Sequence, residues 1–110
     1  MHMKYSSEIK NDILILHLEG DLIGENDGAN VLQVASSAVQ QNIKSCIIDI
    51  SALRYINSSG IGVLITILTK FRNKGGEVYL LNPSESVKKL LVITKLNAIF
   101  QVIRSEDEVK

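Results

Sequence analysis

The sequence predicts a single α/β domain in which helices pack against a mixed, mostly parallel sheet of four to five strands. Short apolar runs alternate with longer segments of helical periodicity. That alternation is typical of parallel strands joined by right-handed crossovers. At 110 residues the chain is long enough to build one core without further cross-links.

The first elements are a strand pair. A dense apolar run predicts a strand over residues 12–18. Tyr5–Ile9 is a weaker strand pattern that pairs with it as a hairpin through residues 10–12. Gly20 and Gly24 then predict a loop.

A helix and a buried strand follow. Apolar residues recur at helical spacing between Glu25 and Asn42, so we expect a helix there. Residues 46–50 form a short apolar run of the kind found in buried strands. The lone cysteine, Cys46, opens this run, and we expect a buried hydrophobic residue rather than a nucleophile.

The second half predicts two further helices and two strands. Turn and capping residues mark the boundaries, with a glycine pair after a cation at one helix end and a serine cap at the next helix start. The expected elements are a helix from Ser58 or Ser59 to Asn73, a stop at Lys74–Gly76, a strand over Glu77–Leu81, a helix from Ser84 to Val92, and a strand over Ile99–Ile103. Residues 104–110 are a polar tail that frays or starts another helix.

The central helix has two faces of different character. At 100° per residue one side is apolar and is expected to face the core. Its residues are Ile61, Leu64, Ile65, Leu68 and Phe71. The other side carries little charge and comprises Ser59, Gly62, Val63, Thr66 and Lys70. It is interpreted either as a small docking patch that begins at the serines, or as surface on which Gly62 packs within the domain and Val63 is a scattered apolar residue.

Catalysis and cofactor binding find no support in the residue pattern. His17 lies inside an apolar strand, and a hydrogen-bonded strand histidine is expected rather than a base. No cysteine or histidine cluster predicts a metal site, and no glycine-rich fingerprint predicts a nucleotide cofactor. Asp49 is interpreted as ordering the following loop through backbone N–H groups, with a phospho-accepting aspartate as the alternative. We therefore expect a protein that is not an enzyme and has no cofactor.

Charge and hydropathy favour neither binding to nucleic acid nor insertion into a membrane. The 12 basic and 12 acidic residues balance, which gives no electrostatic signature of binding to nucleic acid or to an acidic membrane. No apolar run reaches the roughly 18 residues of a membrane span, and no secretory pattern opens the chain. We expect a cytoplasmic protein. Residues 1–2 have the look of a cloning scar, so His2 is left out of any chemistry.

The segment from Cys46 to Leu64, with Asn57-Ser58-Ser59-Gly60 at its centre, resembles the STAS domains of bacterial anti-sigma factor antagonists. The similarity continues through residues 74–78 and 82–91 and spans nearly the whole chain. It implies one STAS domain over residues 1–110, with the sheet and helices described above.

The resemblance implies a partner-switching function. In such systems the antagonist binds an anti-sigma factor that is also a serine kinase, and it is released when the kinase phosphorylates the first serine of the motif. That serine is Ser58 here, and a phosphatase would reverse the modification. The implied docking surface comprises Asp21, Ile23, Gly24, Asn57, Ser59, Gly62, Val63 and Thr66. The protein alone is expected to be a monomer or a weak dimer.

Two residues depart from the family pattern. Asn57 stands where the motif has aspartate, and Ile23 stands where members with a known kinase often have a second aspartate. Asparagine caps a helix as well as aspartate does, so the local structure is expected to persist. Both departures favour the alternative function, which is a STAS subunit that docks without phosphorylation on a transporter ATPase or a larger signalling complex.

Overall fold

The computed structural model describes residues 3–23 and 25–109 and contains one five-stranded sheet. The strands lie side by side in chain order, with the first pair antiparallel and the remaining pairs parallel. They are β1 (Lys4–Lys10), β2 (Ile13–Leu22), β3 (Ser45–Ile56), β4 (Glu77–Leu81) and β5 (Gln101–Ile103). The predicted mixed, mostly parallel sheet is confirmed.

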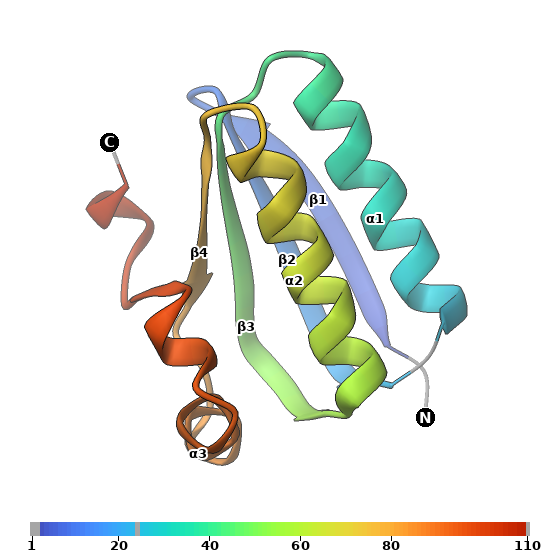
Figure 1. Ribbon diagram of the computed structural model, residues 1–110, viewed down its shortest axis with the longest axis vertical. Helices are drawn as coiled ribbons and strands as arrows, with labels where there is room; N and C mark the ends of the chain where they lie inside the picture. The colour runs from blue at the N-terminus through green and yellow to red at the C-terminus, as the bar shows by residue number, and fades with distance from the viewer. Residues whose placement is uncertain (1–2, 24, 110) are drawn as a thin grey trace.

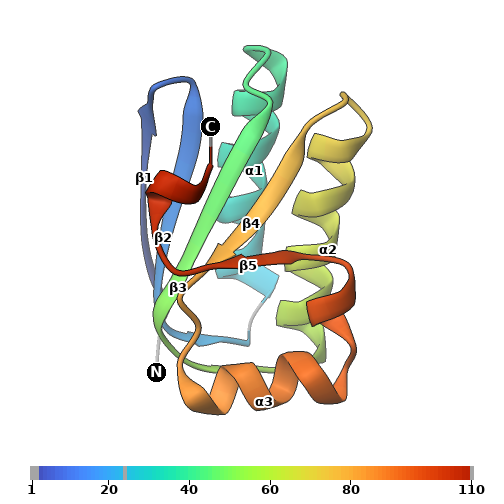
Figure 2. The same ribbon diagram turned by 90° about the vertical axis from the view of Figure 1, so that its left-hand side faces the viewer.

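Three α-helices connect the parallel strands. They are α1 (Glu25–Gln40), α2 (Ser58–Arg72) and α3 (Glu85–Ile93), with short 3-10 turns at Leu96–Ala98 and Glu106–Glu108. Figure 1 shows α1 and α2 side by side over one face of the sheet. Figure 2 shows that α3 instead runs across one end of the sheet, at the end where α2 begins.

The main core lies between the sheet and the helices. It combines apolar residues of β2 and β3, such as Leu16 and Ile48, with apolar residues of α1 and α2. A smaller cluster lies on the opposite face of the sheet, where Val109 of the tail packs against residues such as Ile15 and Ile47. The polar tail therefore does not fray: it forms a capped 3-10 turn that brings Val109 back onto the sheet.

Two strands continue several residues beyond the ends that the sequence predicts, and one is shorter. Gly20, expected in a loop, lies inside β2 with a φ of 93°, next to irregularities in the pairing with β3. These irregularities let β2 continue to Leu22 instead of ending near residue 18. β3 likewise continues to Ile56, because Leu53 and Ile56 turn their side chains into the core. β5 covers only the last part of the expected strand.

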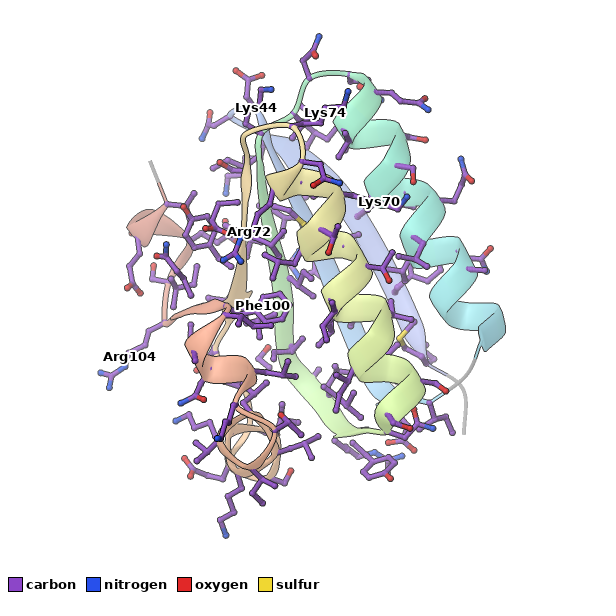
Figure 3. All side chains as sticks on the ribbon, viewed as in Figure 1. Lys44, Lys70, Arg72, Lys74, Phe100 and Arg104 are labelled. Carbon is purple, nitrogen blue, oxygen red and sulfur yellow. The ribbon has the colours of Figure 1, made fainter. Side chains whose placement is uncertain are left out.

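The turns between elements follow the predicted residues. Asn11 and Asp12 both have positive φ in the β1–β2 hairpin. Gly75, with a φ of 77°, follows the end of α2, and a Cβ on Gly76 would lie 2.1 Å from the carbonyl oxygen of Lys44. At the same end, where Figure 3 labels Lys44 and Lys74 close together, the Nζ of Lys44 donates to the carbonyl of Lys74 at 2.6 Å. The expected glycine stop is confirmed.

The buried face of α2 differs from the prediction. Its buried residues are Gly60, Val63, Leu64, Ile67, Leu68 and Phe71. Val63, expected to face outward, is only 9% exposed, whereas Ile65, expected in the core, is 38% exposed. The reason is that α2 has two neighbours, the sheet beneath it and α1 beside it. A Cβ on Gly28 of α1 would lie 2.7 Å from a methyl group of Val63, so the two helices touch at this point.

The two glycines in the first turns of α2 have opposite surroundings. A Cβ on Gly60 would lie 2.2 Å from the carbonyl oxygen of Leu22 and 2.8 Å from a methyl group of Ile56. A Cβ on Gly62 would meet nothing within 4 Å. The close backbone approach considered at Gly62 therefore occurs at Gly60, where α2 lies directly against the end of β2.

Alanine substitutions at these glycines should have opposite effects on stability. Gly60→Ala should lower the free energy of unfolding by about 1–3 kcal/mol or more, because the new methyl group must push β2 and α2 apart. Gly62→Ala should raise it by about 0.5–1 kcal/mol, because alanine favours an exposed helix over glycine. Urea denaturation of both variants measures the difference. Equal effects of the two substitutions would contradict the packing described here.

Candidate functional site

Asn57 joins the end of β2 to the start of α2. Its Oδ1 accepts a hydrogen bond from the backbone N–H of Gly60 at 2.9 Å, as an N-cap does. Its Nδ2 donates to the carbonyl of Ile23 at 3.0 Å, and its backbone N–H donates to the carbonyl of Leu22 at 3.2 Å. One residue thus caps the helix and holds the neighbouring loop. The expectation that asparagine preserves the local structure is confirmed.

The side-chain amide of Asn57 both accepts and donates a hydrogen bond. An aspartate here could accept from Gly60 but could not donate to Ile23, because an ionised carboxylate has no proton to donate. The carboxylate would instead face the carbonyl oxygen of Ile23. The departure from the family pattern therefore has a local structural consequence, which is a direct bond between the loop and the helix cap.

Ser58 and Ser59 are exposed in the first turn of α2. No hydrogen bond joins either hydroxyl group to the residues that the structure describes. Because Asn57 supplies the cap, Ser58 is not needed for it. The first turn contains no acidic residue, and the free N–H groups and the helix dipole give it a partial positive charge. A negative charge on Ser58 would be favoured there.

The β2 end supplies the other side of the site. Because Leu22 pairs with Ile56, the end of β2 lies beside the start of α2. Asp21 accepts from the guanidinium of Arg54 at 3.0 Å, so its charge is balanced. Ile23 is 41% exposed. The candidate residue Gly24 lies outside the described residues.

The remaining candidates divide between surface and core. Gly62 and Thr66 are exposed on α2, and the hydroxyl of Thr66 donates to the carbonyl of Gly62 at 2.8 Å. Val63 does not belong to this surface, because its side chain packs between α2 and α1. The expectation that Val63 faces outward is wrong, whereas its contact with a partner stays a prediction. The other predicted surface residues that the structure describes lie at the end of β2, at the N-cap of α2 or along α2 as far as Thr66.

Two contributions to the site were missed in the sequence. Arg54, which balances Asp21, stands 33 positions away from it, and no local pattern marks the pair. Gly60 was recognised only as part of the motif, although its lack of a side chain allows β2 and α2 to touch. The glycine directly after the two serines was the available signal for that contact.

A second polar cluster lies on the sheet face opposite α1 and α2. The Nδ1 of His17 lies 2.7 Å from Asp49, and its Nε2 lies 3.0 Å from Glu8. Asp49 also accepts from the backbone N–H and the hydroxyl of Ser51, at 3.1 and 2.7 Å. The expectation of a hydrogen-bonded strand histidine is confirmed for His17. Asp49 does accept from a backbone N–H group as expected, but the residues that it orders continue β3 and do not form a loop.

The hydrogen bonds of this cluster shift two pKa values in opposite directions. The bond to Asp49 raises the pKa of His17 above its usual 6.5, although partial burial opposes the rise. Burial alone would raise the pKa of Asp49, but its bonds to Ser51 and His17 outweigh burial and lower it. His17 therefore links β1, β2 and β3 through its hydrogen bonds to two carboxylates, and these carboxylates favour its protonated form.

The described residues contain no group of three or more histidine, cysteine, aspartate or glutamate side chains that could hold a metal ion. Cys46 is fully buried, and burial raises the pKa of its thiol, which makes it unreactive. No helix in the described part of the chain is long and apolar enough to cross a membrane.

Comparison with known proteins gives one consistent result. Residues 4–109 match the model of the STAS domain family. An anti-sigma F factor antagonist of Paenibacillus polymyxa is 23% identical over 106 residues, which cover 96% of this chain and 91% of that protein.

Several solved structures of anti-sigma factor antagonists have the same fold. One is the phosphorylated form of the Bacillus cell fate determinant SpoIIAA, with a TM-score of 0.74, 21% identity, and coverage of 96% of this chain and 95% of that one. Another is an anti-sigma factor antagonist from Mycobacterium paratuberculosis, with a TM-score of 0.80, 17% identity, and coverage of 97% and 90%.

Stability should depend on pH through His17. Because its pKa is raised in the folded state, the stabilisation is complete below the unfolded value of 6.5 and is lost as pH rises through the folded pKa. The free energy of unfolding of the wild type, measured with urea, should therefore fall between about pH 5.5 and pH 8 relative to His17→Gln. A gap between the two proteins that stays constant or widens with rising pH would contradict this account.

Proposed function

Because this chain belongs to the STAS domain family, we propose that it is an anti-sigma factor antagonist whose binding is switched off by phosphorylation of Ser58. Its proposed partner is an anti-sigma factor with serine kinase activity, and a phosphatase restores the binding form. A partner that controls a sigma factor acts where transcription occurs, so the proposed compartment is the cytoplasm.

One observation carries the proposal: Ser58 is exposed at the start of α2, and its side chain neither caps the helix nor bonds to another described residue. Asn57 makes the cap bond to Gly60, and the described residues offer the Ser58 hydroxyl no hydrogen bond. A kinase can therefore modify Ser58 without breaking an interaction that holds the fold. The names of the relatives, which are anti-sigma factor antagonists, support the same function.

The physical basis of the switch lies at the surface. Phosphorylation adds about −1.5 to −2 charges at pH 7. The start of α2 tolerates this charge because its dipole end is positive and Asp21 is already paired with Arg54. A partner that covers an uncharged hydroxyl would have to desolvate the phosphate, which costs several kcal/mol when it is left unpaired. Release therefore follows without a change of fold.

A second candidate function is permanent docking without phosphorylation, on a transporter ATPase or a larger signalling assembly. The exposed side chain of Ile23 favours it, because an apolar residue next to Asn57 suits an interface that is never exposed to solvent. This candidate predicts that Ser58 remains unmodified in the presence of partner and ATP.

Binding and phosphorylation can be tested with the anti-sigma factors of the histidine-kinase-like ATPase class that the same genome encodes. Each is purified and titrated into the protein by calorimetry. We expect one of them to bind wild type and Ser58→Ala with similar affinity, and to bind Ser58→Asp at least tenfold more weakly, since about 1.4 kcal/mol corresponds to tenfold. With ATP and Mg²⁺, phosphopeptide mapping should find phosphate on Ser58.

Ser59→Asp is the matched control, since it places the same charge one residue further along α2. Its affinity should fall less than that of Ser58→Asp. Phosphate on Ser59 alone, or a Ser58→Asp variant that binds like wild type, would rule out Ser58 as the switch. Binding of an anti-sigma factor with no phosphate transfer would select the permanent docking function.

A further inference from the structure

A groove of about 210 Å³ lies between the end of β3 and α3. Its lining is mostly apolar and comprises Arg54, Tyr55, Ile56, Ser86, Val87, Lys89, Leu90 and Ile93. Two of these residues, Ile56 and Val87, are also buried in the main core, whereas Tyr55 and Ile93 are exposed. The groove is separate from the cluster around His17, which lies on the open face of the sheet.

Two apolar residues that line this groove are strongly exposed. Ile93 is 77% exposed and Tyr55 is 55% exposed. Single exposed apolar residues are common on protein surfaces, but a group that lines one hollow is typical of an interaction site. Neither side chain contributes to the buried core, so the fold does not account for them.

The groove is continuous with the surface around Ser58. Tyr55 lies three positions before Ser58, and the intervening Ile56 and Asn57 tie this stretch to β2 and to the start of α2. Figures 1 and 2 both show α3 at the end of the molecule where α2 begins. A protein that covers Ser58 would therefore have the groove within reach.

The charged residues that line the groove favour a partner residue of negative charge. Lys89 is exposed, Arg54 is already paired with Asp21 at 3.0 Å, and the lining contains no acidic residue. Lys88, the neighbour of Lys89, lies outside the lining and pairs with Glu85 at 3.3 Å. The lining therefore suits an apolar side chain with a carboxylate beside it.

We propose that the anti-sigma factor bound at Ser58 inserts an apolar side chain, flanked by an acidic residue, into the groove between Tyr55 and Ile93. This inference rests on the proposed function, since it concerns the same partner. Ile93 acts as an affinity contact that phosphorylation does not alter, whereas Ser58 acts as the switch.

Adjacent residues of α3 provide matched tests. Ile93→Ser removes an apolar residue of the groove, and Val92→Ser removes an equally branched residue that is 61% exposed and lies outside its lining. In calorimetry with the anti-sigma factor that binds wild type, Ile93→Ser should weaken binding about tenfold, and Val92→Ser less than about twofold. Both variants should keep the melting temperature of wild type, because both side chains are exposed.

Charge reversal at the two adjacent lysines tests whether the partner places a carboxylate near Lys89. Lys89→Glu should weaken binding several-fold, and Lys88→Glu should leave it nearly unchanged. Amide hydrogen exchange should slow in residues 86–93 when the anti-sigma factor is added. If the two lysine variants weaken binding equally, or if the amides of α3 exchange as fast as in the free protein, the groove is not part of the interface.

The outcomes separate this inference from the proposed function. If Ser58→Asp weakens binding and Ile93→Ser does not, the groove inference is rejected and the proposed function stands. If Ile93→Ser instead breaks a wild-type dimer in sedimentation while anti-sigma factor affinity is unchanged, the occupant is a second copy and the inference is overturned. If no anti-sigma factor binds wild type, both are rejected.

Discussion

The first turn of α2 lies against the end of β2 with no space for a side chain between them, and the geometry of the candidate site depends on this contact. Gly60 permits the approach, since a Cβ there would lie 2.2 Å from the carbonyl oxygen of Leu22. Asn57 fixes it with hydrogen bonds to Gly60, Leu22 and Ile23. The contact sets the direction in which α2 leaves the sheet, and with it the position of the two serines.

This arrangement places residues that hold the fold and residues that are exposed within one stretch of four. Asn57 and Gly60 hold the fold, while Ser58 and Ser59 between them are exposed. A site of modification beside a rigid junction can gain charge without loss of stability, because the helix dipole favours that charge and no existing hydrogen bond is broken. The proposed switch then acts on the partner, which must accommodate a phosphate in place of a hydroxyl.

Most of the element order could be predicted from the sequence, because apolar periodicity and turn residues are local signals. The length of β3 could not, since its continuation to Ile56 depends on pairing with β2 and on the burial of Leu53. The orientation of α2 was also mispredicted. A helical wheel assumes one buried face, whereas α1 lies beside α2 and buries Val63 against Gly28. In the candidate site, Ser58 and Asn57 were evident from their pattern, but the pair of Asp21 and Arg54 joins residues 33 positions apart and has no local signature.

The central claim is that a phosphate on Ser58 changes the surface and leaves the fold intact. Nuclear magnetic resonance of the protein with phosphoserine incorporated at position 58, compared with the unmodified protein, tests it most directly. Changes in backbone amide shifts should be confined to the start of α2 and the end of β2, and the amide of Gly60 should keep its hydrogen bond to Asn57. Shift changes that extend through β3 and β4, or loss of the Gly60 hydrogen bond, would show that phosphorylation acts by altering the fold and would contradict the account.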